Sequence, residues 1–180
     1  MYGILRKIFT TPRTAIPRGD FALKDGEFEK LGERLREAVF SSLKGSLAIR
    51  EVAAGSSNAE EQELTALSSP YYDVERFGIT FVASPRHADV LFVSGPVARN
   101  MAEALRRTYA ATPDPKIVVA VGDAAIDGGI FKGSYAIAGA VKDVIPVDVE
   151  IPGDPPSPKA VIAAMLSVVE KLGDKRKTRS

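Results

Sequence analysis

The stretch from Lys116 to Gly122, KIVVAVG, decides the fold class of this chain. Most of its apolar residues are β-branched, they follow one another without polar alternation, and Pro115 and Gly122 bound the run. A second run, Asp89–Ser94 (DVLFVS), is also largely apolar throughout. Unalternated apolar strands are typical of a parallel sheet that helices cover on both faces. The two runs therefore predict an α/β fold.

The rest of the pattern predicts strands and helices in alternation around these two runs. Further strands are expected at 46–53 and 79–83, with a weaker candidate at 144–149, because Pro146 suits the edge of a sheet. Apolar spacing and turn signals predict helices at 28–43, 59–68, 98–111 and 158–172. Asn58 is expected to cap the second of these helices. We expect a doubly wound, flavodoxin-like, mostly parallel four-stranded sheet with helices on both faces.

The amino-acid composition excludes several classes of chemistry. Among 180 residues there is no cysteine, no tryptophan and a single histidine, His87. Disulfides, zinc held by thiolates, iron–sulfur ligation by cysteine and thiol nucleophiles are therefore excluded. A catalytic triad or a multi-histidine metal site would depend on His87 alone. Since His87 stands in a loop beside Arg86, we interpret it as a surface or hydrogen-bonding residue, and we expect no catalytic residue.

The charge is concentrated at the two ends of the chain. Residues 1–18 carry four basic residues and no acidic one, and residues 171–180 carry five basic residues against Asp174. We expect a basic amino-terminal arm (1–18), a single α/β domain (19–172) and a basic tail (173–180). Such ends favour an acidic partner or an anionic membrane surface, although they can also be merely solubilising. No stretch approaches 18 apolar residues in a row, so no membrane span is expected.

Loops at one edge of the predicted sheet are the expected place for a ligand. In doubly wound sheets the crevice lies outside the carboxyl ends of the strands. Four loops rich in glycine, proline and small polar residues qualify: Ala54–Glu60, Gly95–Asn100, Gly122–Gly129 and Pro152–Pro156. The carboxylates that could share one acidic crevice are Glu60, Glu63, Asp123, Asp127 and Asp154. Two of them could share a proton or hold Mg²⁺. The segment Gly122–Gly129 does not have the spacing of a calcium loop, and forming turns is the simpler role for Asp123 and Asp127.

The same loops carry a resemblance to a known family. The motifs that carry it are Ser69–Gly78 (SPYYDVERFG), Ser84–Asp89 (SPRHAD), Gly95–Glu103 (GPVARNMAE), Gly122–Gly129 (GDAAIDGG), Phe131–Tyr135 (FKGSY) and Pro152–Pro156 (PGDPP). The sequence resembles the B subunit (20-kDa type) of NADH–quinone oxidoreductase and the small subunits of energy-converting, membrane-bound [NiFe] hydrogenases. The likeness covers roughly residues 4–172.

The resemblance implies a cofactor that this chain lacks the residues to hold. The family holds one [4Fe–4S] cluster on four cysteines, in the patterns G-S-C-N-G-C-D, G-D/S-C-A and P-G-C-P-P. The matching positions here are Ser57, Glu60, Ala124 and Asp154. A hydroxyl, two carboxylates and a methyl group do not replace thiolates, so we expect no cluster and no other bound cofactor.

The resemblance also implies a place in a larger assembly. We expect a subunit of a respiratory complex I-like or membrane-bound hydrogenase-like complex that acts structurally or in regulation, as a non-catalytic part of an oxidoreductase. The implied partners are a large hydrogenase-like or complex I-like subunit and membrane-arm subunits, without nucleic acid. The implied location is the cytoplasmic face of the inner (plasma) membrane, held peripherally through these partners.

Three alternatives stay open at this point. The former cluster crevice could have become a divalent-metal site, with Glu60, Asp123 and Asp154 as ligands, alongside Ser57. It could borrow a cofactor such as flavin. The chain could also remain an electron-transfer subunit, as in the parent family.

Overall fold

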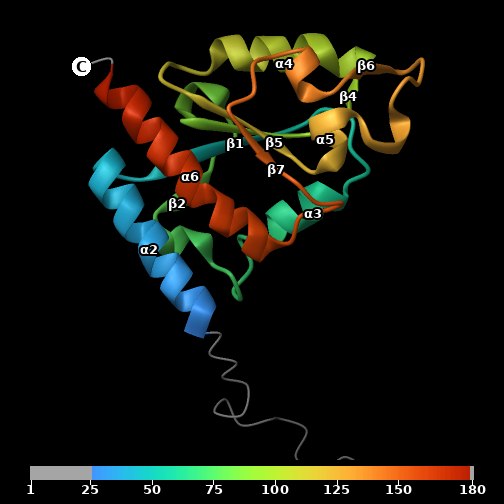
Figure 1. Ribbon diagram of the computed structural model, residues 1–180. Coiled ribbons are helices and arrows are strands. Elements are labelled where there is room, and N and C mark those ends of the chain that lie inside the picture. Colours follow the sequence, from blue (N-terminus) through green and yellow to red (C-terminus); the bar gives the residue numbers. More distant parts are fainter. Residues whose placement is uncertain (1–25, 179–180) are drawn as a thin grey trace, which may run out of the picture.

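The computed structural model describes residues 26–178, which form a parallel sheet flanked by helices on both faces (Figure 1). The strands are β1 (Leu47–Ala53), β2 (Ile79–Phe81), β3 (Val90–Ser94), β4 (Val97–Ala98), β5 (Ile117–Val121), β6 (Ile137–Gly139) and β7 (Val149–Ile151). The α-helices are α2 (Gly26–Leu43), α3 (Ala59–Ala66), α4 (Arg99–Ala111), α5 (Asp123–Asp127) and α6 (Pro158–Lys177). Short 3-10 helices lie at Val74–Phe77, Pro85–His87, Gly129–Phe131 and Val141–Asp143.

The main sheet confirms the predicted fold class. Its order is β2-β1-β3-β5-β7, and every neighbouring pair is parallel. Counting only these five strands along the chain, the order is 2-1-3-4-5, the doubly wound order of flavodoxin-like folds. The sheet has five strands rather than the four expected. The predicted strand at 144–149 is wrong in position, since residues 144–148 form a turn and loop and the ladder with β5 begins only at Val149.

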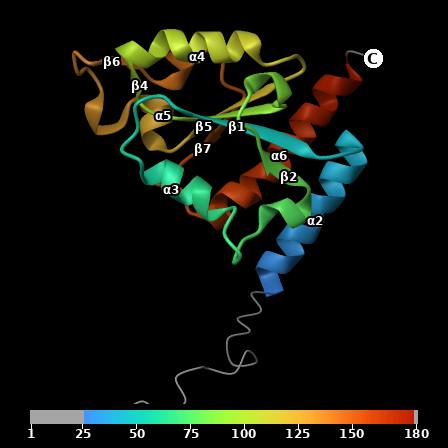
Figure 2. The same cartoon turned by 180° about the vertical axis from the view of Figure 1, so that it is seen from behind.

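Two apolar cores lie on opposite faces of the sheet. On one face α2, α3 and α6 cover a core that includes Phe92 and Met165. On the other face α4 and α5 cover a smaller core that includes Leu91 and Leu105. Figure 1 shows α4 above the sheet and α2, α3 and α6 below it, and Figure 2 shows the same layers from behind. Strands β3 and β5 are buried along their whole length, as their unalternated sequences predict.

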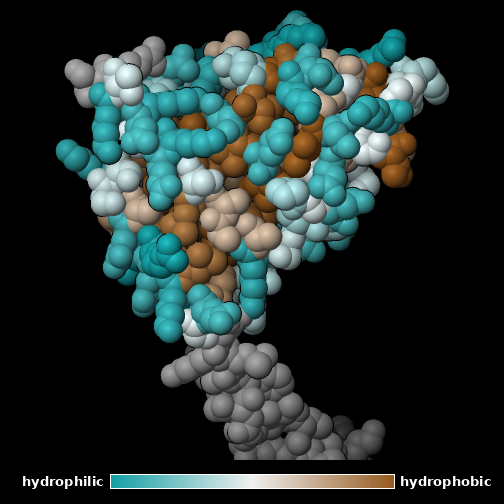
Figure 3. Space-filling view, viewed as in Figure 1, coloured by the Kyte–Doolittle hydropathy of each residue, from teal (hydrophilic) through white to brown (hydrophobic). Residues whose placement is uncertain are grey.

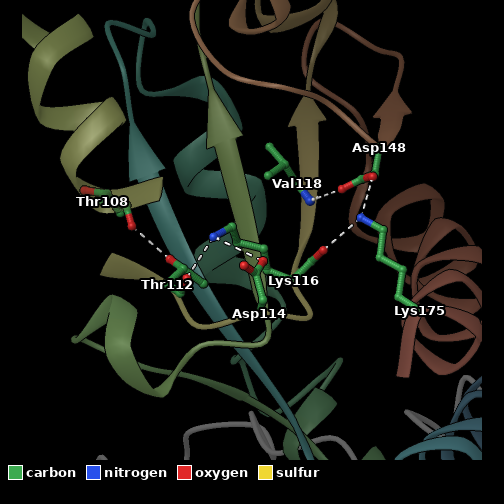
Figure 4. A network of polar contacts seen from close by, with 7 residues as sticks. All are labelled: Thr108, Thr112, Asp114, Lys116, Val118, Asp148 and Lys175. Carbon is green, nitrogen blue, oxygen red and sulfur yellow. Dashed lines mark hydrogen bonds and ion pairs between the residues drawn. The ribbon is translucent and has the colours of Figure 1, made fainter. Parts of the chain in front are cut away.

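Two aspartates at the amino edge of the sheet fasten the end of α6. Asp89, just before β3, accepts the Ala48 amide at 3.0 Å and the Arg176 guanidinium at 2.7 Å. Asp148, just before β7, accepts the Val118 amide at 2.9 Å and the Lys175 ammonium at 2.7 Å (Figure 4). The helix α6 ends at Lys177, five residues beyond the helix predicted at 158–172, and these contacts hold its last turn against the sheet. Residues 173–177 of the predicted tail are thus helical; the division into arm, domain and tail stays a prediction, and the arm at 1–18 lies outside the described residues.

Replacing Asp148 tests this anchoring. Asp148→Ala is expected to lower the free energy of unfolding by about 1–2 kcal/mol, because it leaves the Val118 amide without its acceptor and leaves the Lys175 ammonium with the Lys116 carbonyl but no carboxylate. Asp148→Asn keeps an acceptor for the amide and loses only the charge, so it should fall between the two. Urea titration of the three proteins measures the difference, and an alanine variant as stable as the parent would show that the contacts contribute nothing.

Candidate functional site: the crevice at the carboxyl ends of the strands

The predicted loops meet in one crevice at the carboxyl ends of β1, β3, β5 and β7. A cavity of about 300 Å³ opens there. Its lining residues are Ser57, Glu60, Gly95, Pro96, Asp123, Ala124, Asp127, Gly129, Ile130, Phe131 and Asp154. All four loops expected from the sequence contribute to this lining. From β1 the sheet extends to β2 on one side and to β3, β5 and β7 on the other, so the strand order reverses between β1 and β3. The crevice lies at this reversal, which is the usual ligand position in this class of fold.

The four positions that correspond to the family's cysteines all line this cavity. Ser57 is exposed in the loop between β1 and α3, and Glu60 is buried in the first turn of α3. Ala124 is half-buried in α5, and Asp154 is exposed in the loop between β7 and α6. Segments nearly 100 residues apart in sequence are thus brought to one place, while none of the four side chains is a thiolate.

The side chains present do not fit an iron–sulfur cluster. Such clusters are held by soft thiolate donors, whereas the crevice offers a hydroxyl, two carboxylates and a methyl group at the equivalent places. Among residues 26–178 there is also no group of three or more acidic or histidine side chains arranged to hold a metal ion. The predicted metal set of Glu60, Asp123 and Asp154 therefore shares a cavity without forming a compact ligand group.

Glu60 is the most unusual residue of the crevice. Its side chain is only 2% exposed, and within the described part of the chain its Oε2 atom has no hydrogen-bond partner. Its Oε1 lies against Gly122, where an added Cβ would come within 2.8 Å of that oxygen. Burial raises the pKa of Glu60 above the ordinary glutamate value of 4.5; its own backbone amide opposes the shift, while the charges of Glu61 and Asp154 add to it. A buried carboxylate with one oxygen left without a partner in this way lowers the stability of the folded chain.

The neighbouring Glu61 is held by two serines that the sequence analysis did not single out. Ser56 and the fully buried Ser94 both donate hydrogen bonds to Glu61 Oε1. This arrangement ties the start of α3 to the end of β3. The predicted cap is wrong, because Asn58 makes no side-chain cap hydrogen bond and instead takes a left-handed conformation with φ of 75°. The only sequence signal for the true arrangement is the serine that ends the apolar run DVLFVS.

The other acidic candidates do less in the crevice. Asp123 accepts the Gly153 amide at 2.8 Å, and Asp127 accepts the Gly129 amide at 2.8 Å, so one oxygen of each supports a turn. Glu63 is half-buried and does not line the cavity. His87 is exposed in the 3-10 helix before β3, at the opposite edge of the sheet.

An exposed apolar segment stands beside the mouth of the crevice. Between α5 and β6 the side chains of Ile130, Phe131 and Tyr135 are 91%, 45% and 88% exposed. Ile130 and Phe131 also line the cavity. Figure 3 shows hydrophobic surface at the right-hand edge of the molecule, where this segment lies in Figure 1. The following strand β6 pairs with β4 in a small antiparallel ribbon, which the sequence analysis did not predict. Exposed apolar clusters of this kind mark surfaces that bind other molecules.

Glu60→Gln is expected to stabilise the chain at neutral and alkaline pH. Because the folded-state pKa lies above the unfolded-state value, this carboxyl supports folding most below the unfolded pKa, and that support is lost as pH rises through the folded pKa. A glutamine does not titrate, so the variant should match the parent near pH 4 and melt a few degrees higher at pH 8, at about 2–4 °C for each kcal/mol.

Thermal unfolding of both proteins between pH 4 and pH 8 measures this difference. Glu170→Gln, at an exposed position of α6, is the matched control and should change the melting temperature at neither pH. A Glu60→Gln variant that melts below the parent at pH 8 would contradict the assignment of Glu60 as a destabilising buried acid.

Comparison with known proteins finds relatives that match most of the chain. The family described as NADH ubiquinone oxidoreductase, 20 Kd subunit, matches residues 58–168. An uncharacterized protein of Methanocaldococcus jannaschii is 46% identical over 136 residues, which cover 76% of this chain and 91% of that protein. A probable membrane-bound hydrogenase subunit of Pyrococcus furiosus is 44% identical over 121 residues, covering 67% of this chain and 72% of that protein.

A solved structure gives the same assignment. A chain in the structure of the membrane-bound sulfane sulfur reductase, an archaeal respiratory membrane complex, is 34% identical, with a TM-score of 0.65 and coverage of 77% of both chains. Within residues 26–178, no helix combines the length and apolar character that crossing a membrane requires. The family match, the curated relatives and the shared fold lead to one conclusion: the chain belongs to the family of the NADH ubiquinone oxidoreductase 20 Kd subunit.

Proposed function

We propose that this chain is a subunit of a membrane-bound hydrogenase-like or complex I-like respiratory complex, in which it acts structurally or in regulation and does not carry electrons. The observation that carries the proposal is the crevice itself: the four loops of the family site are assembled around one cavity, and no thiolate lines it. Relatives that are named as a membrane-bound hydrogenase subunit, or come from a respiratory membrane complex, support the placement.

The proposal separates two tasks that a cluster-bearing subunit performs together. Electron transfer needs the cluster, whereas assembly needs only the fold and its surfaces. The fold is intact, and the apolar side chains of Ile130, Phe131 and Tyr135 remain exposed beside the crevice. On this proposal the partners are a large hydrogenase-like or complex I-like subunit and membrane-arm subunits, which hold the chain peripherally at the cytoplasmic face of the membrane.

Affinity purification of the tagged full chain from membranes of its native host tests the proposal. We expect a homologue of the large hydrogenase-type subunit and membrane proteins to co-purify. A variant with Ile130→Ser and Tyr135→Ser should recover less of them, whereas Phe40→Ser, at a 53% exposed apolar site on α2, should not. Recovery of the parent chain only as a monomer, with no partner, would overturn the proposal.

The alternatives expected from the sequence have distinct tests of their own. A divalent-metal site should give saturable Mg²⁺ or Mn²⁺ binding that Asp154→Ala weakens, but the spread of the carboxylates within the described chain does not favour it. A borrowed flavin, or a retained electron-transfer role with some other chromophore, should give a coloured preparation. A colourless, metal-free complex would exclude these alternatives and support the structural or regulatory role.

A further inference from the structure

Within the part of the chain that the structure describes, the crevice is lined by acidic side chains and by no basic one. Four of its lining side chains are carboxylates, namely Glu60, Asp123, Asp127 and Asp154, and among residues 26–178 no lysine, arginine or histidine lines it. The remaining lining residues are small or apolar. The lining therefore carries an excess of acidic groups, and concave sites with low-dielectric walls concentrate the field of such groups.

Glu60 is a second, independent observation that favours a ligand in the cavity. The residue is only 2% exposed and lines the cavity, and its Oε2 atom has no hydrogen-bond donor among the described residues. Asp154 lies close enough for its charge to act on Glu60. Buried ionised carboxylates are normally paired, so a positively charged group from outside would stabilise the ionised form of Glu60.

The arrangement of the carboxylates favours an organic cation over a metal ion as the ligand of the cavity. One oxygen of Asp123 and one of Asp127 are already bound to backbone amides, and the described acidic residues form no compact ligand set. A planar guanidinium can donate to a buried carboxylate with one edge and to a second acid with its other N–H groups. Its aliphatic stem can also lie along apolar surface, which Ile130 and Phe131 provide at the mouth.

We propose that the former cluster crevice receives the guanidinium group of an arginine from a partner subunit, which pairs with Glu60 at the base and with Asp154 at the mouth. The origin of this arginine in a partner rests on the proposed function. The chemistry of the crevice does not, since it depends only on residues of this chain. The pairing converts the site of electron transfer into a charge-based contact that fixes the partner's position.

The affinity of the isolated full chain for a guanidinium probe tests the inference. N-acetyl-arginine amide is titrated into the isotope-labelled protein and followed by two-dimensional amide NMR, with N-acetyl-citrulline amide as the neutral isostere. We expect saturable shifts in residues 57–61, 122–131 and 153–155 with the arginine compound and none with the citrulline compound. Glu60→Gln should weaken binding at least tenfold and Asp154→Asn severalfold, whereas Glu170→Gln should leave it unchanged.

Four results would overturn the inference: no saturable binding of the arginine compound, equal binding of the citrulline compound, unchanged binding to Glu60→Gln, or Mg²⁺ that fills the crevice at lower concentration and displaces the arginine compound. These outcomes are independent of co-purification. A chain that binds the probe but recovers no partner would contradict the proposed function alone, and a chain that recovers its partner but ignores the probe would contradict the crevice assignment alone.

Discussion

A variant with cysteine at Ser57, Glu60, Ala124 and Asp154 is expected to gain a [4Fe–4S] cluster. The four positions line one cavity in the folded chain, so four thiolates would converge where the family places them. Anaerobic reconstitution should give close to four irons and four sulfides per chain, with the broad visible absorption of a cluster, from a parent that takes up none.

A three-cysteine version provides the matched control. With serine at position 154 and cysteine at the other three, the protein should bind less iron and lose it faster to a chelator, since one thiolate is missing. The interpretation of the crevice as a former cluster site would be contradicted if the four-cysteine protein folded normally and still bound no iron. Circular dichroism and thermal unfolding establish whether each variant is folded.

Gly122→Ala is expected to produce the largest loss of stability of any single substitution considered. Gly122 has φ of 90° and ψ of 154°, a conformation that is essentially restricted to glycine. An added Cβ would also lie 2.8 Å from Glu60 Oε1 and 2.9 Å from its Cγ. Backbone strain and overpacking together should lower the free energy of unfolding by about 2–5 kcal/mol, measured by urea titration.

A double-mutant cycle separates the two causes. Glu60→Ala removes the side chain that the new methyl group would strike, so Gly122→Ala should be less destabilising in that background, by roughly the 1–3 kcal/mol of the overpacking part. Full additivity of the two substitutions would show that Glu60 does not pack on Gly122. The strain of the backbone should remain in both backgrounds.

The fold could be predicted from the sequence because the two central strands are apolar almost throughout. Because apolar side chains of the runs DVLFVS and KIVVAV point to both faces of the sheet, both faces must be covered. Strands of this kind lie in the middle of a parallel sheet. The position of the crevice then follows from the strand order. Edge elements were harder to predict: β7 contributes only Val149–Ile151 to the ladder, and β4 and β6 are too short to show a pattern.

Details of the site could not be predicted, because they depend on contacts between distant segments. Glutamate is usually exposed, and nothing in the local sequence distinguishes the buried Glu60 from the half-buried Glu61 beside it. The distinction arises when Ser94, at the end of β3, takes Glu61 as its acceptor and leaves Glu60 to face the cavity. In the same way, Asn58 is a good cap by residue type, but the turn places it in a left-handed conformation.

The structure shows where the absence of cysteine matters. This absence becomes the lack of a thiolate at four positions around one cavity, in a chain that belongs to the family of the NADH ubiquinone oxidoreductase 20 Kd subunit. The carboxylates that replace two of the thiolates change the character of the crevice from a soft-ligand site to an acidic one. An assembly role with an altered contact is therefore a consistent account of the fold, the charge and the exposed apolar rim.

Iron and acid-labile sulfide analysis of the chain, purified anaerobically as part of its native complex and then separated from its partners, tests this account most directly. The account predicts co-purifying partners and essentially no iron or sulfide on this chain. Close to four irons and four sulfides per chain, the content of one [4Fe–4S] cluster, would contradict it.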